Sequence, residues 1–180
     1  MRVVAGSARG VPLTVPRDRG TRPITDRVKE TLFAILGERV PDARVLDLYA
    51  GTGAIGIEAL SRGAASVDFV EHGRAAADAL RGNLSRTRLE VDARVHVVDV
   101  ERFLAAADGG PWDLAILDPP YETRAIVAPL MALVPHLARG ATVVVKHFWR
   151  TEVPAVDRLA ISRQRRFGET MLTYLEVEDA

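Results

Sequence analysis

Short apolar runs alternate with amphipathic stretches along most of this chain, from residue 44 to residue 147. The apolar runs are rich in Val, Ile and Leu, and the stretches between them repeat apolar residues at helical spacing. Such an alternation predicts an α/β fold with a parallel sheet covered by helices on both faces. The expected strands are 44–49, 66–70, 94–98, 113–117 and 141–147, and the expected helices are 54–62, 74–86, 101–107 and 123–137.

The N-terminal part of the chain follows a different pattern. Residues 2–5 and 11–15 flank a turn bounded by glycines, which predicts a small hairpin. Thr25 or Asp26 can cap a helix that ends at Gly37. The buried stripe expected for this helix is Val28, Leu32, Ile35 and Leu36.

The C-terminal part has two strand-like runs, 158–167 and 170–176, with only Gly168 and Glu169 between them. This spacing predicts a hairpin, so the last strand should run antiparallel to the others. Pro129 and Pro135 disfavour an unbroken helix over 123–137 and can move its start to near Pro129.

A length of 180 residues fits one domain, here divided into an extension at 1–37 and a core at 44–180. The chain has no cysteine, and its four histidines lack metal-ligand spacing, so neither a disulfide framework nor a metal site is expected. The first residues lack the apolar run of a signal peptide, and no stretch approaches the roughly 20 apolar residues that cross a bilayer. We expect a cytoplasmic monomer.

The net charge of zero conceals an uneven distribution. Residues 1–30 carry seven Lys/Arg against three Asp/Glu, and residues 146–166 carry six against two, which makes each segment +4. Two basic segments can meet the phosphates of a nucleic acid, or they can serve solubility alone. For RNA contact we favour the arginines of the N-terminal segment, Arg17, Arg19, Arg22 and Arg27.

A glycine-rich turn follows the first core strand. Gly51, Gly53 and Gly56 have the G-x-G-x-x-G spacing, and Glu71 lies twenty residues after Gly51, at the end of the next strand. Glycines let the backbone approach a ligand closely, and a carboxylate in that position accepts both hydroxyls of an adenosine ribose. We also assign Thr52 to this cofactor site.

The spacing alone fits a nicotinamide dinucleotide as well as S-adenosylmethionine. Asp47, four residues before the first glycine, favours S-adenosylmethionine, because a carboxylate repels a pyrophosphate but attracts the cationic amine and sulfonium. Asp99 follows the third strand and offers an acceptor for the adenine amino group. Tyr49 is placed in the same cofactor site.

The sequence Asp118-Pro119-Pro120-Tyr121 follows the fourth core strand. Ligands bind outside the carboxyl ends of strands in such sheets, so this motif should face the same crevice as the glycine turn. The Asp118 carboxylate and the Pro119 carbonyl can hold both hydrogens of a planar amine, and Tyr121 can stack on its ring. With an ordinary pKa of about 3.9, Asp118 is expected to be ionised and able to take a proton after transfer.

With these motifs the chain resembles the class I methyltransferases, and among them the RsmD-type guanine-N2 methyltransferases of small-subunit (16S) ribosomal RNA. The residues that carry the resemblance are 2–6, 21–33, 45–60, 69–71, 117–121 and 166–168. The resemblance implies a Rossmann-like sheet of seven strands with the last one antiparallel. It further implies methylation of a guanine in the small ribosomal subunit or an assembly intermediate, with Asp118, Pro119 and Tyr121 at the target amine.

The resemblance also implies that Gly51, Gly53, Glu71 and Asp99 hold the cofactor, and that residues 22–27 lie over the crevice near cofactor and RNA. Lys146, at the end of the fifth strand, departs from the acidic or neutral residue expected there. Other functions stay open at this point: methylation of DNA, of a protein glutamine or of a small amine, NAD-dependent oxidoreduction, and RNA binding by an assembly factor without catalysis.

Overall fold

The computed structural model describes residues 1–15, 24–119 and 124–178. Its strands are β1 (Arg44–Leu48), β2 (Ser66–Val70), β3 (Ala93–His96), β4 (Trp112–Leu117), β5 (Leu137–Phe148), β6 (Leu159–Phe167) and β7 (Thr170–Val177). Its α-helices are α1 (Asp26–Leu36), α2 (Ala54–Ser61), α3 (Arg74–Thr87), α4 (Val100–Ala106) and α5 (Arg124–Leu133). Short 3-10 turns follow at Gly37–Arg39, Glu90–Asp92 and Val134–His136.

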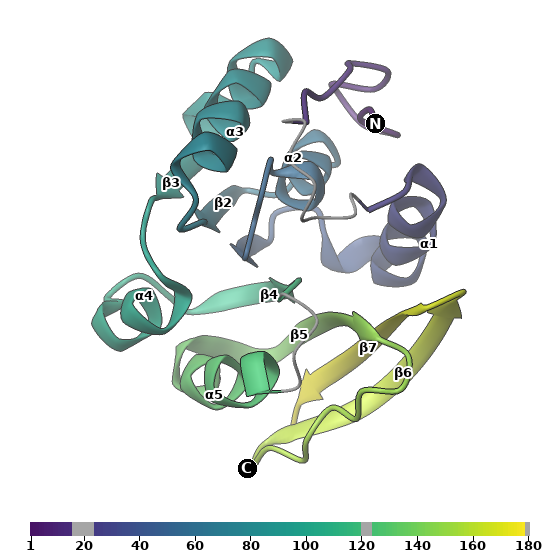
Figure 1. Cartoon of the computed structure of the whole chain (residues 1–180), viewed down its shortest axis with the longest axis vertical. Coiled ribbons are helices and arrows are strands. Elements are labelled where there is room, and N and C mark those ends of the chain that lie inside the picture. The colour runs from purple at the N-terminus through teal and green to yellow at the C-terminus, as the bar shows by residue number, and fades with distance from the viewer. Residues whose placement is uncertain (16–23, 120–123, 179–180) are drawn as a thin grey trace.

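The strands form one seven-stranded sheet in the order β3-β2-β1-β4-β5-β7-β6 (Figure 1). β1 lies parallel to β2 and β4, and the pairs β2–β3 and β4–β5 are also parallel. β7 runs antiparallel to both β5 and β6, which confirms the C-terminal hairpin expected from the sequence. The chain order reverses between β1 and β4, and the carboxyl ends of strands at such a reversal form the usual ligand crevice of α/β sheets.

Helices cover both faces of the sheet: α1, α2 and α3 on one, α4 and α5 on the other (Figure 1). Successive residues of a strand point to opposite faces, so each strand contributes to two apolar cores. In β1, Val45 belongs to the core under α1–α3, whereas Leu46 and Leu48 belong to the core under α4 and α5. This burial on both faces explains the nearly continuous apolar runs of the sequence.

The boundaries differ from the expectation by more than one residue at three elements. β3 ends at His96 rather than at residue 98, so Asp99 lies three residues after the strand rather than directly after it. α5 runs through Pro129, which sits inside the helix and does not begin it. The helix ends at Leu133, before the turn that contains Pro135, and β5 already begins at Leu137.

The N-terminal arm folds back on itself but pairs less extensively than a hairpin. A single isolated bridge joins Arg2 and Pro12, and the Val3 N–H donates to the Val11 carbonyl at 3.0 Å. The arm docks on the end of α2, where the Ser7 N–H donates to the Ser61 carbonyl at 2.7 Å. The arm is therefore held by contacts with α2 as well as by its own pairing.

A buried ion pair joins α1, α2 and this arm. The Lys29 ammonium lies 3.2 Å from Oε2 of Glu58, and both side chains are fully buried. Glu58 also accepts hydrogen bonds from the backbone N–H groups of Val4 and Ala5, at 2.8 and 2.9 Å, and from Nε of Arg62 at 2.9 Å. The sequence pattern did not predict that Lys29 is buried, because its burial depends on Glu58, which lies on another helix.

Replacing Glu58 by glutamine is expected to lower the free energy of unfolding by about 3–5 kcal/mol, because the buried Lys29 ammonium would lose the nearer of its two carboxylate partners and keep only Asp26, 3.9 Å away. Urea denaturation followed by circular dichroism measures the change. Arg39→Ala is the matched control, since the Arg39–Glu176 pair is 53% and 43% exposed and should contribute only about 0–1 kcal/mol. Equal effects of the two substitutions would contradict the prediction.

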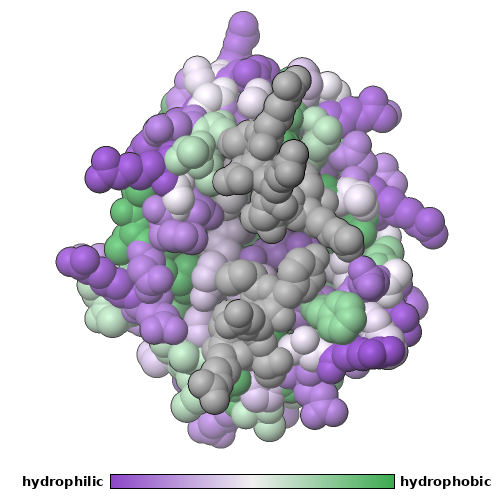
Figure 2. All heavy atoms as spheres, in the orientation of Figure 1, coloured by the Kyte–Doolittle hydropathy of each residue, from purple (hydrophilic) through white to green (hydrophobic). Residues whose placement is uncertain are grey.

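The surface shown in Figure 2 is largely polar, and its apolar residues are scattered among hydrophilic ones. Among the described residues, the large apolar side chains that are exposed are Val91, Val97, Met131 and Ile161. No helix in the described part of the chain has the length and apolar character needed to span a membrane.

Candidate active site

The glycine turn connects β1 to α2 through an unusual backbone path. Tyr49 has a φ of 60°, and Gly51 and Gly53 have φ values of 55° and 80°. A Cβ on Gly53 would lie 2.1 Å from Cδ1 of Leu80 on α3, so this position requires glycine for its space as well as its conformation. A left-handed conformation is rare for tyrosine, and such backbone strain is concentrated at functional sites.

Gly56 allows α2 to approach β2. A Cβ at Gly56 would lie 2.2 Å from Cε1 of Phe69, a contact that ordinary packing does not tolerate. The third glycine of the motif therefore serves helix–strand packing, as its spacing predicts.

Glu71 bridges the ends of two neighbouring strands. It directly follows β2, and its Oε2 accepts a hydrogen bond from the Gly51 N–H at 2.9 Å. Its Oε1 accepts from the Gly73 N–H at 2.6 Å. A carboxylate oxygen can accept more than one hydrogen bond, so Glu71 can order the turn and still receive donors from a ligand.

Asp47 lies beneath the turn, inside β1, and is buried. Its Oδ2 accepts a hydrogen bond from the Gly56 N–H at 2.9 Å, which satisfies one of the unpaired donors in the first turn of α2. Burial, with smaller contributions from the charges of Asp118 and Glu71, raises the pKa of Asp47 to about 7 against the opposing effect of the Gly56 bond. A cation placed near this carboxyl would favour its ionised form.

Asp99 caps α4 and is exposed. Its Oδ1 accepts from the backbone N–H groups of Glu101 and Arg102, at 2.9 and 3.3 Å. Burial raises the pKa of Tyr49 to about 12, with further contributions from the charges of Asp99 and Glu101. Tyr49 follows β1 and Asp99 follows β3, so both lie at the same edge of the sheet.

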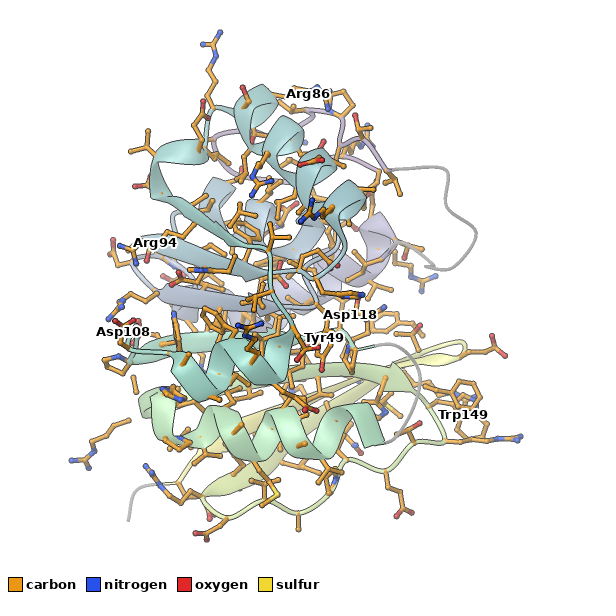
Figure 3. The ribbon with its side chains drawn as sticks, turned by 60° about the vertical axis from the view of Figure 1, so that its left-hand side comes forward. Tyr49, Arg86, Arg94, Asp108, Asp118 and Trp149 are labelled. Atoms are coloured by element: carbon orange, nitrogen blue, oxygen red, sulfur yellow. The ribbon has the colours of Figure 1, made fainter. Side chains whose placement is uncertain are left out.

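Asp118 directly follows β4, and its N–H donates to the Leu48 carbonyl of β1 at 3.4 Å. Figure 3 shows Asp118 close to Tyr49 at the centre of the molecule, far from Asp108 before the start of β4. The motif and the glycine turn therefore share one edge of the sheet, as their positions after strands predict.

The Asp118 carboxylate forms an ion pair with a lysine of the neighbouring strand. The Lys146 ammonium, on β5, lies 2.6 Å from Oδ1 and 2.8 Å from Oδ2 of Asp118. Burial raises the pKa of Asp118 above its ordinary value, and the Lys146 charge and hydrogen bonds act in the opposite direction. The expectation of an unperturbed carboxyl was wrong, because it considered neither burial nor this partner.

The other predicted site residues are distributed as follows. Pro119 is buried beside Asp118. The carbonyl of Thr52 accepts a hydrogen bond from Nδ2 of Asn83 at 3.0 Å. Arg27 is exposed on the first turn of α1. Tyr121 and the predicted RNA-contacting arginines Arg17, Arg19 and Arg22 lie outside the described residues.

Sequence reasoning did not find the role of Asn83. This fully buried residue of α3 donates to the carbonyls of Thr14 and Thr52, and its Oδ1 accepts from the Thr14 N–H at 2.8 Å. It therefore ties the N-terminal arm to the glycine turn. The available signal was a polar residue on the apolar stripe of a helix, between Leu80 and Leu84.

The charges and hydrogen-bond acceptors of this edge define the ligand that it can bind. Three carboxylates, Asp47, Glu71 and Asp99, follow or end consecutive strands around the glycine turn. They suit a ligand with hydroxyl or amino donors and a positive charge, and they disfavour a pyrophosphate. No cluster of three or more potential metal-ligating side chains occurs in the part of the chain that the structure describes.

Solved structures of the same fold are described as methyltransferases. The "Putative methyltransferase yhhF" from Escherichia coli superposes with a TM-score of 0.87 at 35% identity, over 99% of this chain and 98% of that chain. The "putative methylase HI0767" from Haemophilus influenzae superposes with a TM-score of 0.84 at 27% identity, over 99% of both chains. The protein thus has the Rossmann-like fold of the class I methyltransferases.

Sequence comparison identifies the family within this class. The model of the family described as "Conserved hypothetical protein 95" matches residues 1–176. The "Putative rRNA methyltransferase YlbH" of Bacillus subtilis is 36% identical over 94% of this chain and 95% of that protein. "Ribosomal RNA small subunit methyltransferase D" of Escherichia coli is 43% identical over 68% of this chain and 61% of that protein. The chain belongs to this family, that of the RsmD-type methyltransferases.

Proposed function

We propose that the protein transfers a methyl group from S-adenosylmethionine to the exocyclic N2 amine of a guanine in small-subunit ribosomal RNA. The observation that carries this proposal is the position of Asp118, a half-buried carboxylate at the end of β4 next to the glycine turn of β1. The names of the relatives support ribosomal RNA as the substrate. The choice of guanine N2 rests on the resemblance to the RsmD-type enzymes.

The residues around the glycine turn fit S-adenosylmethionine. Glu71 would accept the ribose hydroxyls with the lone pairs that its bonds to Gly51 and Gly73 leave, and Asp99 would accept from the adenine amine. Asp47 would stabilise the positive charge of the methionine part. When bound, S-adenosylmethionine supplies an electrophilic methyl group on a sulfonium, so that the nitrogen–carbon bond forms as the carbon–sulfur bond breaks and its electron pair stays on sulfur.

Asp118 prepares the amine for this transfer. The lone pair of an exocyclic amine is delocalised into the ring, which makes the nitrogen a weak nucleophile. A hydrogen bond from the amine N–H to the Asp118 carboxylate favours a pyramidal nitrogen whose lone pair can attack the methyl carbon. The nitrogen becomes positively charged as the new bond forms, and one N–H proton then passes to Asp118 or to water. Much of the acceleration would come from holding the amine in line.

Access to the amine requires the guanine to leave its base stack, at a cost of a few kcal/mol. The exposed Arg27 and the aromatic–cationic group at the end of β5 offer contacts for the surrounding RNA. In that group the Trp149 ring contacts two guanidinium groups, with Cζ of Arg166 3.8 Å and Cζ of Arg150 4.8 Å from its ring centroid. These positive charges suit phosphates, and Figure 3 shows Trp149 at the periphery of the molecule, whereas Asp118 lies near its centre.

The substrate assignment is tested by labelled methyl transfer to small ribosomal subunits that lack this modification, followed by nucleoside analysis. Recovery of label in N2-methylguanosine supports the proposal. Label on DNA, on a protein glutamine or on a small amine, and not on RNA, would show that the proposed RNA substrate is wrong. RNA binding without any transfer would instead indicate an assembly factor that does not catalyse.

The affinity for S-adenosylmethionine is expected to fall as the pH drops below about 7, the value to which burial raises the pKa of Asp47. Below that pH the free carboxyl is protonated, and binding of a cation must release the proton. The affinity should therefore decrease by up to about tenfold per pH unit. Calorimetric titration from about pH 5.5 to about pH 8.5 measures this slope. Asp47→Asn should bind S-adenosylmethionine more weakly and with an affinity that no longer depends on pH in this range. If the pH dependence is unchanged in this variant, it arises from a group other than Asp47.

A further inference from the structure

We propose that Lys146 is a positioning residue of the methyl-transfer reaction: its ammonium holds the Asp118 carboxylate in a fixed orientation and in the ionised form that accepts the target amine. This inference rests on the proposed function and extends it. It concerns a residue that lies one strand away from the motif in space and twenty-eight residues away in the sequence.

The geometry of the pair supports this role. One ammonium nitrogen contacts both carboxylate oxygens, at 2.6 and 2.8 Å, so it fixes the plane of the carboxylate as well as its charge. Lys146 itself is 7% exposed, and its side chain has little freedom to leave this position. Two carboxylate oxygens have about four acceptor sites. Lys146 uses one site on each oxygen, which leaves acceptor sites for an amine N–H.

The charges around Asp118 explain why a cation is needed. Asp47 of β1 interacts electrostatically with Asp118. Tyr49, which follows β1, lies close to Asp118 at the same edge of the sheet. From the end of β2, Glu71 adds a further carboxylate around Asp47. Lys146 of β5 supplies the opposing positive charge. Burial and neighbouring carboxylates both favour the protonated acid, which would donate to an amine rather than accept from it.

If Lys146 acts through its positive charge, its removal should have a different effect from the one expected if Lys146 serves packing alone. If the charge acts on Asp118, its removal raises the pH at which Asp118 ionises, and the acid limb of the rate profile moves with it. An opposite charge at this distance typically changes a carboxyl pKa by about 1–3 units. If Lys146 only fills space, its removal changes the stability or the rate at all pH values together.

The test compares Lys146→Met with Lys146→Arg, which keeps the positive charge. Single-turnover methyl transfer to unmodified small subunits is measured as a function of pH. We expect the acid limb of Lys146→Met to move up by about 1–3 pH units, so that its rate at a given pH on that limb falls by about 10- to 1,000-fold and recovers in alkali. Lys146→Arg should keep the wild-type limb. A uniform loss at every pH in Lys146→Met would overturn the proposal.

A second measurement does not depend on activity or on the folding of a variant. In wild-type protein labelled with ¹³C at aspartate carboxyls and ¹⁵N at lysine amines, the Asp118 carboxyl and the Lys146 Nζ signals should shift with the same midpoint. Independent midpoints would refute the coupling. If the wild type transfers no methyl to ribosomal subunits, the proposed function fails, yet this titration still decides whether Lys146 controls Asp118.

Discussion

Replacing Asp118 by alanine reduces methyl transfer about 1,000-fold or more and leaves S-adenosylmethionine binding nearly unchanged: this is the result expected from the site. General acid–base groups typically contribute 10²- to 10⁴-fold, and here the same carboxylate also orients the amine. The cofactor contacts, in contrast, are assigned to the glycine turn and to Glu71, which the substitution does not alter.

A loss of stability could imitate this result, because Asp118→Ala removes the carboxylate that is paired with the buried Lys146 ammonium. The double variant Asp118→Ala/Lys146→Met removes both charges and serves as the matched control. It should regain most of the unfolding free energy lost in the single variant but remain inactive. Single-turnover kinetics, calorimetric cofactor binding and urea denaturation together measure the three quantities.

Two outcomes would contradict the assignment. Full activity of Asp118→Ala would remove Asp118 from the reaction. Recovery of activity in the double variant would mean that the carboxylate only neutralises Lys146, and the amine acceptor would then have to be sought elsewhere at the edge of the sheet.

The architecture was largely predictable because it depends on local patterns. β2 has the predicted bounds, and α1 begins after its Thr25 cap and ends at Gly37, as the capping residues indicated. The antiparallel last strand follows from the two residues that separate β6 from β7. Errors occurred where a local signal conflicted with packing: Pro129 disfavours a helix interior, yet apolar contacts of α5 with the sheet keep it helical.

The positions of the site residues were predictable as far as they depend on strand ends. Gly51 and Glu71 were paired by their spacing, and the structure joins them at 2.9 Å. The partners of buried polar groups were not predictable, because each partner comes from a distant element. Asn83 bonds to Thr14, sixty-nine residues away in the sequence. Lys146 of β5 bonds to Asp118 at the end of the adjacent strand β4, and no short motif contains both residues.

Replacing Glu71 by glutamine should weaken S-adenosylmethionine binding about 100-fold. Both oxygens of Glu71 accept backbone hydrogen bonds, from Gly51 at 2.9 Å and from Gly73 at 2.6 Å. Glutamine converts one oxygen to an NH₂ group, which would face a backbone N–H and disturb the turn. It also loses the charge that strengthens bonds from the ribose hydroxyls, each worth about 1.5–3 kcal/mol. A loss of about 3 kcal/mol in all corresponds to the expected 100-fold.

Calorimetric titration of the cofactor measures this effect, and His72→Ala is its control. His72 is 79% exposed and its Nδ1 lies 3.4 Å from Oε1 of Glu71, so its removal leaves both backbone bonds of the carboxylate in place and should change the affinity little. The rate at saturating cofactor should remain near that of the wild type in Glu71→Gln, because Glu71 contacts no reacting atom in the proposed mechanism. If Glu71→Gln binds the cofactor normally but transfers the methyl group slowly, Glu71 takes part in the reaction and not in cofactor binding.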